Sequence, residues 1–318
     1  MACLGHLLCV LALLLCGPPS PGLSRPHKRG PKKPIIGVLM QKCRTKEMKN
    51  LGKYYIAASY VKYLESAGAR VVPIRLDLPL TQYTELFRSI NGILFPGGSA
   101  SISQSEYSNT ARIFFNKAIE SYDDGDYFPV WGTCLGFEEL AFLVSGENLL
   151  TLTNTVSVPL PLNFTEGALQ GRMFQNFPAE LLVSLALEPL TANFHKWSLS
   201  VKNFTKNEKL KKVFNILTTN TDGNIEFISS MEGFTYPIYA VQWHPEKAPY
   251  EWKDLGGISH APNAVKTAFY LADFLVSEAR KNNQRYENEF EEMKSLIYQF
   301  SPVYTGNISS FQQCYMFD

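Results

Sequence analysis

The stretch FPVWGTCLGFEEL, Phe128 to Leu140, joins an apolar run to a cysteine between two glycines and then to a pair of glutamates. The run up to Cys134 is typical of a buried strand, and the residues after it have helical spacing that ends at Gly146. Cys134 is therefore predicted to lie where a strand turns sharply into a helix, as the reactive residue does in a nucleophile elbow. The flanking glycines, Gly132 and Gly136, would let the backbone pass close to neighbouring strands.

Predicted strands and helices alternate on both sides of this stretch. Strands are predicted over 34–40, 70–77, 91–99 and 236–246, and helices over 54–67, 81–90, 105–122 and 264–280, the second with Thr81 as its N-cap. This alternation predicts an α/β fold with a doubly wound, mostly parallel sheet and helices on both faces, whose ligand sites lie at the carboxyl ends of the strands. Residues 149–236 are rich in β-branched and turn residues, which indicates antiparallel insertions in the second half of the chain.

The composition excludes several classes of protein. A chain of 318 residues that is 45% hydrophobic can bury a large core, and no composition shift divides it into independent parts. The formal net charge of +1 provides no field that would attract nucleic acid, so we expect no nucleic-acid partner. No CxxC pair or HExxH motif is present, and we expect neither a metal site nor a cofactor.

The N-terminus is typical of a secretory signal peptide over residues 1–24. Its apolar run is too short for a membrane span, which needs ~20 residues, and small residues precede the expected cleavage before Arg25. Residues 25–318 are then expected to be a single mature domain without a membrane anchor, because no later apolar stretch is long enough to span. Three N-x-S/T sequons also favour export, to a lysosomal lumen or out of the cell; they begin at Asn163, Asn203 and Asn307.

The number of cysteines bears on the role of Cys134. Removal of the signal peptide leaves Cys43, Cys134 and Cys314, an odd number, so at least one thiol is unpaired or bridges to another chain. Cys43 and Cys314 could form a disulfide, but their spacing does not decide it. A lone buried cysteine is more often inert, yet the elbow motif favours a nucleophile, and the helix that starts at Leu135 is expected to lower the thiol pKa.

A thiol nucleophile needs a base and an oxyanion hole. His244 in VQWHPE follows another predicted strand and should reach the same sheet edge, and Glu246 is close enough in sequence to orient the imidazole. His195 in ANFHKW is the serious competitor, since an aromatic-flanked histidine in an insertion could line the same cleft. The backbone N–H groups of Gly98 and Leu135 are the oxyanion-hole candidates, although an ordinary loop glycine is an even alternative for Gly98.

Three motifs in this order, LFPGG (94–98), WGTCLGFE (131–138) and VQWHPE (241–246), resemble the class I glutamine amidotransferase-like superfamily. Within it the chain is similar to the gamma-glutamyl hydrolase family over most of its length. The resemblance implies that Cys134 attacks the γ-carbonyl of a γ-linked glutamate in a folylpoly-γ-glutamate or an antifolate polyglutamate and forms a thioester. It also implies that His244 protonates the leaving amine and then activates water, that the protein is a homodimer, and that it works in an acidic compartment.

Three substrate-binding residues are predicted with this resemblance. Tyr60 and His195 are candidates for the substrate cleft, with a packed amphipathic tyrosine as the alternative for Tyr60. Glutamine amidotransferases usually carry Gln where this chain has Glu138, whose carboxylate could pair with the α-ammonium of a glutamyl substrate or only suit the helix N-terminus. The alternative function is a glutaminase that acts on free glutamine and feeds ammonia to a synthase. The sequence contains no synthase domain, and export would separate the chain from one, so hydrolysis is favoured.

Overall fold

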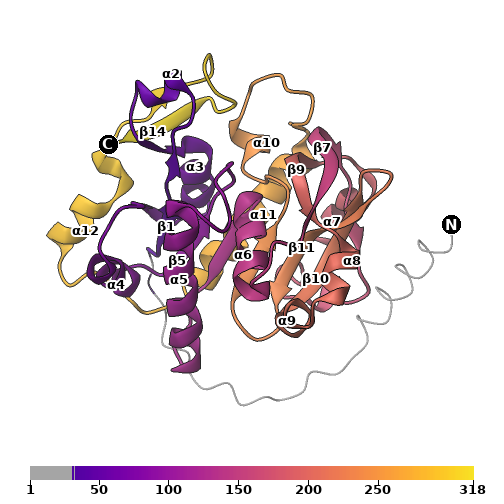
Figure 1. The fold of residues 1–318 in the computed structure, drawn as a ribbon, viewed down its shortest axis with the longest axis horizontal. Helices are drawn as coiled ribbons and strands as arrows, with labels where there is room; N and C mark the ends of the chain where they lie inside the picture. Colours follow the sequence, from indigo (N-terminus) through magenta and orange to yellow (C-terminus); the bar gives the residue numbers. More distant parts are fainter. Residues whose placement is uncertain (1–30, 32) are drawn as a thin grey trace. The chain divides into compact units, whose positions relative to one another are not determined.

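An eight-stranded sheet forms the centre of the computed structural model, which describes residue 31 and residues 33–318 (Figure 1). The predicted signal peptide, residues 1–24, and its cleavage site lie outside the described residues. The strand order is β4-β1-β5-β6-β12-β11-β10-β8, with bounds β4 (Arg70–Ile74), β1 (Ile35–Leu39), β5 (Gly92–Phe95), β6 (Val130–Thr133), β12 (Ile238–Val241), β11 (Glu226–Gly233), β10 (Phe214–Thr221) and β8 (Asn163–Phe164). The first five strands pair in parallel and the last three pair antiparallel, which confirms the predicted mostly parallel sheet.

Helices cover both faces of this sheet (Figure 1). α3 (Ala58–Ser66) packs against α11 (Pro262–Ala279), which also contacts α7 (Ala179–Leu187), while α5 (Glu106–Asp123) packs between α4 (Leu80–Ser89) and α6 (Leu135–Ser145). β1, β5, β6 and β12 are buried along their whole length, as strands covered on both faces must be. The shorter helices are α2 (Lys46–Lys49), η1 (Ala168–Gln170), α8 (Val201–Lys206), α9 (Glu208–Val213), α10 (Lys247–Tyr250), α12 (Glu289–Ser295) and η2 (Ile297–Gln299).

Two smaller sheets accompany the large one. β13 (Val303–Tyr304), β14 (Gln313–Phe317), β3 (Tyr54–Ala57) and β2 (Gln41–Lys42) form one, and the ribbon β7 (Leu150–Leu160) with β9 (Thr191–Leu199) forms the other. The ribbon and the β10–β11 hairpin confirm the antiparallel segments predicted after residue 149. No helix in the described part of the chain is long and apolar enough to cross a membrane.

Two local predictions were wrong. The helix predicted over 54–67 is a strand in its first four residues, because Tyr54–Ala57 pair with the C-terminal strand β14, a partner that local periodicity cannot reveal. Thr81 is not an N-cap: the helix starts one residue earlier, at Leu80, and Pro79 precedes it with a φ of −66°. The predicted ends at Ser105 and Gly146 are confirmed, since the Ser105 side chain caps α5 and Gly146 closes α6 with a φ of 76°.

Candidate active site

The turn between β6 and α6 holds Cys134 in a conformation that few non-glycine residues adopt. Its φ is 53° and its ψ is −106°, which confirms the predicted sharp elbow, and its N–H donates to Val241 O at 2.9 Å. The flanking glycines are needed for space. A Cβ at Gly136 would lie 2.0 Å from Phe95 O, and one at Gly132 would lie 2.5 Å from Gly136 O. The elbow is thus packed directly against the neighbouring strands β5 and β12.

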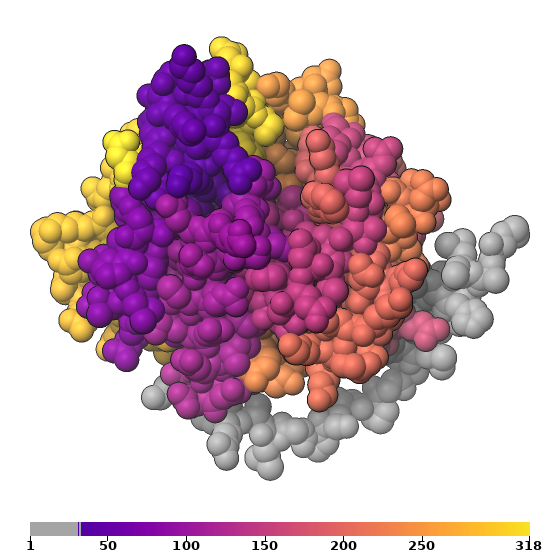
Figure 2. Space-filling view, viewed as in Figure 1, coloured from indigo at the N-terminus to yellow at the C-terminus, as the bar shows by residue number. Residues whose placement is uncertain are grey.

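Gly97 is the point where the reactive side chains meet. A Cβ at this position would lie 2.6 Å from His244 Cε1, 2.9 Å from the Tyr60 hydroxyl oxygen and 3.2 Å from Cys134 Cβ. The carboxyl ends of β5, β6 and β12 therefore bring Cys134 and His244 against one glycine, as parallel strands of one sheet should. The space-filling view shows an indented surface between the indigo segment and the orange and pink segments (Figure 2).

His244 is held by a buried carboxylate. Its Nδ1 lies 2.7 Å from Glu246 Oε1, and the exposed fraction is 5% for His244 and 0% for Glu246. Burial lowers the pKa of His244, and the attraction of Glu246 offsets only part of this. Burial also penalises the charge on Glu246, but the hydrogen bond from His244 holds its pKa below the ordinary value. Because Nδ1 faces Glu246, Nε2 is the nitrogen available for proton transfer.

The pKa of the Cys134 thiol differs from the prediction, which expected the N-terminus of α6 to lower it. Burial raises the pKa of the thiol well above its ordinary value, and the nearby carboxylates of Glu138 and Glu246 raise it further. The N–H of Leu135 hydrogen-bonds the sulfur and opposes this shift only in part. The helix N-terminus therefore does not make a thiolate here, and without substrate the site holds a neutral thiol beside a neutral imidazole.

The two oxyanion-hole candidates lie on either side of the elbow. The N–H of Gly98 has no hydrogen-bond acceptor within residues 33–318, while the N–H of Gly97 donates to the Tyr60 hydroxyl at 2.8 Å. Gly98 is packed against Gln41, because a Cβ there would lie 2.5 Å from Gln41 Oε1. Gly98 and Leu135 thus keep N–H groups at the edge where the thiol lies, and Gly97, which the sequence did not single out, fills the space between the catalytic side chains.

Glu138 is buried beside Cys134, with 8% of its surface exposed. Its Oε1 accepts from Gln242 Nε2 at 3.1 Å. Burial raises the pKa of Glu138 to about 8, so the side chain is a neutral acid in an acidic compartment. Glu138 also lies in the first turn of α6, where the helix dipole favours an acid, so both interpretations of this residue stay predictions.

Glu139, the second glutamate of the opening stretch, is fully buried on the same helix. Ser108 Oγ lies 2.7 Å from Ile102 O and 2.8 Å from Glu139 Oε1. A hydroxyl has one proton, and the carbonyl can only accept, so both contacts are hydrogen bonds only if Glu139 carries a proton itself. Burial raises the pKa of Glu139 to about 8, in agreement with this geometry. Glu139 therefore connects α6 to the first turn of α5.

We expect the protein to lose thermal stability as the pH rises from about 5 to about 8.5. The pKa of Glu139 is raised from 4.5 to about 8 in the fold, so its contribution is complete below 4.5 and is lost as the pH rises through 8. Glu139→Gln removes this titrating group, so the fall in melting temperature between about pH 5 and about pH 8.5 should be smaller than in the wild type by roughly 3–8 °C. Thermal melts across pH would measure it, with the exposed Glu147→Gln as the matched control. Parallel curves for wild type and Glu139→Gln would contradict the prediction.

His195 and Tyr60 lie in different surroundings. Tyr60 is 2% exposed, and its hydroxyl is 3.4 Å from His244 Nδ1, so it contacts the catalytic histidine. His195 is buried between the strands of the ribbon, where Nε2 lies 3.1 Å from Asn193 Oδ1 and Nδ1 lies 3.0 Å from Ser198 Oγ. Burial lowers the pKa of His195 to about 3. The hydrogen bonds found for His195 do not include Cys134, and substrate contact by either residue stays a prediction.

The structure adds site residues that the sequence analysis missed. Lys247 is 3% exposed, and its Nζ lies 5.2 Å above the Phe194 ring and 4.7 Å above the Phe311 ring. Gln242, two residues before His244, contacts Glu138 as described above. Both residues belong to the segment QWHPEK, and their closeness in sequence to the predicted base, His244, could have identified them as site candidates.

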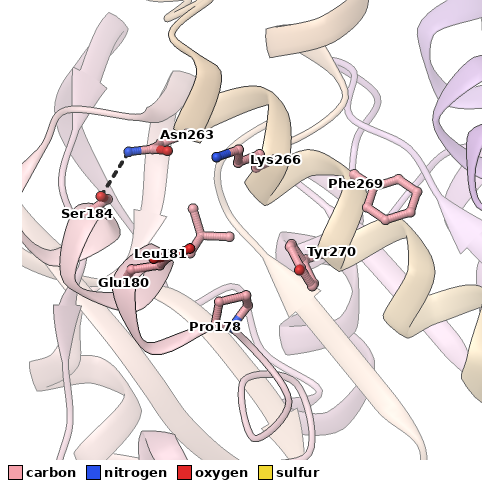
Figure 3. A pocket seen from close by; sticks show the side chains of 8 residues that line it. All are labelled: Pro178, Glu180, Leu181, Ser184, Asn263, Lys266, Phe269 and Tyr270. Atoms are coloured by element: carbon pink, nitrogen blue, oxygen red, sulfur yellow. Dashed lines mark hydrogen bonds between the residues drawn. The ribbon is translucent and has the colours of Figure 1, made fainter.

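Several pockets lie outside this constellation. Gln41, Lys42, Arg44 and Tyr107 are among the residues that line one of about 330 Å³, which adjoins the Gly98 loop. Another, of about 540 Å³, lies between α7 and α11 and is lined by Leu181, Ser184, Asn263, Phe269 and their neighbours (Figure 3). It contains none of the reactive side chains. Within the described residues, no cluster of three His, Cys, Asp or Glu side chains could hold a metal ion, and Cys43, Cys134 and Cys314 are unpaired.

Comparisons with known proteins agree with these motifs. A family model described as Peptidase C26 matches residues 34–246. The chain is 75% identical to gamma-glutamyl hydrolase of Homo sapiens and 74% identical to that of Mus musculus, in each case over 100% of both chains. Gamma-glutamyl hydrolase B of Dictyostelium discoideum is 41% identical, with 90% of this chain and 83% of the relative covered. The solved glutaminase domain of Trypanosoma brucei CTPS with bound acivicin has a TM-score of 0.51 at 12% identity, covering 80% of this chain and 96% of that one, which is a likeness of fold.

Proposed function

The chain belongs to the peptidase C26 family, and we propose that it is a cysteine hydrolase that cleaves γ-glutamyl bonds, as the shared name of its relatives indicates. The observation that carries this proposal is the meeting of Cys134 and His244 at Gly97, with the Glu246 carboxylate held against His244 Nδ1 at 2.7 Å. A thiol, an imidazole and an orienting carboxylate are what acyl transfer through a covalent intermediate requires.

Acylation begins with transfer of the thiol proton from Cys134 to His244 Nε2. The sulfur then forms a bond to the γ-carbonyl carbon, and the negative charge that develops on oxygen is stabilised by the N–H groups of Gly98 and Leu135. Collapse of this intermediate breaks the C–N bond, and His244 returns its proton to the leaving amine. The Glu246 carboxylate stabilises the transient imidazolium, which its hydrogen bond at 2.7 Å supports.

Deacylation repeats the sequence with water. His244 Nε2 takes a proton from the attacking water, the same N–H groups hold the oxyanion, and the thioester C–S bond breaks. The sulfur recovers the proton from His244, and a γ-carboxylate leaves. Burial lowers the pKa of His244, which extends the pH range of its base form to lower pH than for an ordinary histidine.

The proposed substrates are folylpoly-γ-glutamates and antifolate polyglutamates. Each γ-linked glutamate carries an α-carboxylate, and the buried Lys247 ammonium, held between two aromatic rings, is a suitable partner for one. The α-nitrogen of the first glutamate is an amide in such substrates, so a neutral Glu138 can accept its N–H without a charge. Tyr60 and His195 are proposed to contribute to the cleft, Tyr60 through Gly97 and His244.

The second candidate function is a glutaminase that acts on free glutamine. The likeness to the CTPS glutaminase domain concerns the fold, and Glu138 stands where that class usually carries glutamine. Incubation of the mature chain at about pH 5 with a γ-linked glutamate oligomer, an α-linked oligomer and free glutamine separates the two. We expect cleavage of the γ-linked oligomer alone. Release of ammonia from glutamine with the γ-linked oligomer intact would reject the main proposal.

We expect Glu138→Gln to retain activity in acid and to change the alkaline side of the pH profile. Since the pKa of Glu138 is raised to about 8, the wild-type side chain is neutral below that pH and an amide resembles it. The variant's kcat/KM should stay within about threefold of wild type at pH ~5 and fall less steeply above pH ~8. Glu138→Ala is the control and should lose activity at every pH. Inactivity of Glu138→Gln at pH ~5 would instead mean that a negative charge is required.

We also propose that the protein is a homodimer. Apolar side chains of the C-terminal segment are exposed and suit a second copy of the chain: Phe290 is 58% exposed, Met293 57%, Tyr298 61% and Tyr304 61%. Light scattering would measure the mass. A monomer at micromolar concentration would reject this proposal.

We propose that residues 1–24 direct the chain into the secretory pathway and that residues 25–318 form one mature domain, delivered to the lysosome or secreted. Asn163 and Asn307 are exposed and ready to carry glycans. Asn203 is half-buried, and its Nδ2 donates to Leu149 O at 2.8 Å and to Thr151 Oγ1 at 3.2 Å. Attachment of a glycan to Asn203 Nδ2 would remove one of the two N–H groups that make these hydrogen bonds.

A further inference from the structure

The β7–β9 ribbon has its polar side buried and its apolar side exposed. The buried side carries Thr153, Thr155, Asn193, His195 and Ser198, none more than 6% exposed. The outward side carries Leu152 at 62%, Trp197 at 50% and Val156 at 49% exposed. A ribbon on a protein surface normally has the opposite arrangement, with apolar residues inward. An apolar outward face of this kind indicates a ligand or a partner.

The exposed apolar residues are adjacent in the ribbon. Leu152 lies opposite Trp197, and Val156 lies opposite Phe194, so the two pairs form one stripe along the outward face. Asn154 and Lys196 are the exposed polar residues of the two strands beside these pairs, and the Asp222 carboxylate, from the turn between β10 and β11, accepts from Asn154 N at 2.9 Å. We call these residues, Leu152, Val156, Phe194 and Trp197, the ribbon stripe.

The ribbon stripe begins at the catalytic histidine. The N–H of His244 donates to Ala192 O of β9 at 2.9 Å, which joins the ribbon to the catalytic segment. The Phe194 ring lies 6.2 Å from the His244 ring and 5.2 Å from Lys247 Nζ. Trp197 lies three residues further along the strand, roughly 10 Å away at ~3.3 Å per residue. The stripe therefore leads from the reacting atoms outward, as β7 and β9 do beside α10 in Figure 1.

We propose that the ribbon stripe is the subsite for the aromatic acyl end of the substrate, a flat aroyl group attached to the α-nitrogen of the first γ-linked glutamate. This inference rests on the proposed function, whose substrates have one aromatic end and one polyanionic end. The aromatic end matches an apolar stripe that contains an exposed indole and no acid. The polyanionic end is assigned to the pocket beside Gly98, where Arg44 lies together with Lys42, whose ammonium is paired with Glu106 at 3.2 Å. The site thus assigns a direction to the bound chain.

Kinetics with a pair of substrates test the proposal. We expect Trp197→Ala to raise KM about tenfold for 4-aminobenzoyl-γ-diglutamate, with kcat within about twofold of wild type. KM for γ-linked diglutamate without the aryl group should stay unchanged. Phe269→Ala is the matched control, because Phe269 is also a half-exposed aromatic side chain, at 48%, but lies on α11 in another pocket. It should leave both substrates unaffected.

A binding measurement keeps this test separate from that of the proposed function. Calorimetry would measure the binding of 4-aminobenzoyl-glutamate to Cys134→Ala protein and to the double variant that also carries Trp197→Ala, and it needs no turnover. We expect the double variant to bind about tenfold more weakly. An equal rise in KM for both substrates, or no rise for either, would overturn the proposed subsite. So would a change of oligomeric mass in Trp197→Ala, since the stripe would then be covered by a second copy. A wild type that cleaves neither substrate but shows the calorimetric difference would overturn the proposed function and support the subsite.

Discussion

Replacing Cys134 by alanine is expected to lower kcat for a γ-linked glutamyl substrate by at least about 10⁴-fold. The substitution removes the atom that forms the thioester, and His244 is left with no nucleophile at the elbow. Alanine keeps the Cβ that packs beside Gly97 and His244, so the fold and substrate affinity should stay nearly intact. Burst and steady-state kinetics with the wild type and the variant would measure the loss, and calorimetry would compare the affinities.

Cys43→Ala is the matched control for this experiment. Cys43 is a buried free thiol like Cys134, but it lies next to β2 and is not among the side chains that meet at Gly97. Its loss should leave kcat within about twofold of wild type. Residual activity of Cys134→Ala above a few per cent would place the nucleophile elsewhere. A variant that also fails to bind substrate would show that the thiol contributes to recognition as well as to chemistry.

Replacing Gly136 by alanine is expected to destabilise the protein by about 3 kcal/mol or more, or to prevent folding. The added Cβ would lie 2.0 Å from Phe95 O and 2.8 Å from Phe95 C. Both are backbone atoms of β5, which is paired on both sides and cannot move away. Alanine favours helix over glycine by only about 1 kcal/mol, which is smaller than this clash. Urea denaturation of soluble protein, or the yield of folded protein, would measure the effect.

Gly167 provides the control for Gly136. A Cβ there would be no closer than 3.8 Å to another residue, and its φ is −85°, so alanine fits without strain. Gly167→Ala should be neutral or stabilising by up to about 1 kcal/mol, since it restricts the unfolded chain. A Gly136→Ala variant with an unchanged denaturation midpoint would show that α6 can shift away from β5. In that case the elbow would be less rigid than its packing indicates.

Three buried ionisable groups near the sulfur are consistent with work in an acidic medium. Burial raises the pKa of Glu138 and of Glu139 to about 8, and both are neutral acids below that pH. Burial lowers the pKa of His244, so the imidazole becomes protonated at a lower pH than an ordinary histidine does. Glu246, whose pKa is held below its ordinary value, and the neighbouring Lys247 are then the charged side chains of the site in acid.

Much of the fold was predictable because its signals are local. Strands β1, β4, β5, β6 and β12 are short apolar runs followed by glycine or turn residues, and α5, α6 and α11 carry helical periodicity with recognisable ends. The first turn of the predicted helix over 54–67 was wrong because its pairing partner, β14, is about 260 residues away in the chain. The N-cap prediction for Thr81 was wrong because the helix begins one residue earlier, after Pro79, whose φ of −66° is compatible with a helix start.

The sequence by itself singled out the residues that we propose to carry the chemistry, because the elbow, the base and the carboxylate lie in short motifs at strand ends. Only the tertiary structure decided their protonation. Burial reverses the expected effect of the helix N-terminus on the Cys134 thiol, and burial depends on every element that packs around a group rather than on its neighbours in sequence. Tertiary packing likewise placed Gly97, not Gly98, between Cys134 and His244. It also turned the apolar side of the ribbon outward, where Trp197 is exposed to meet a ligand.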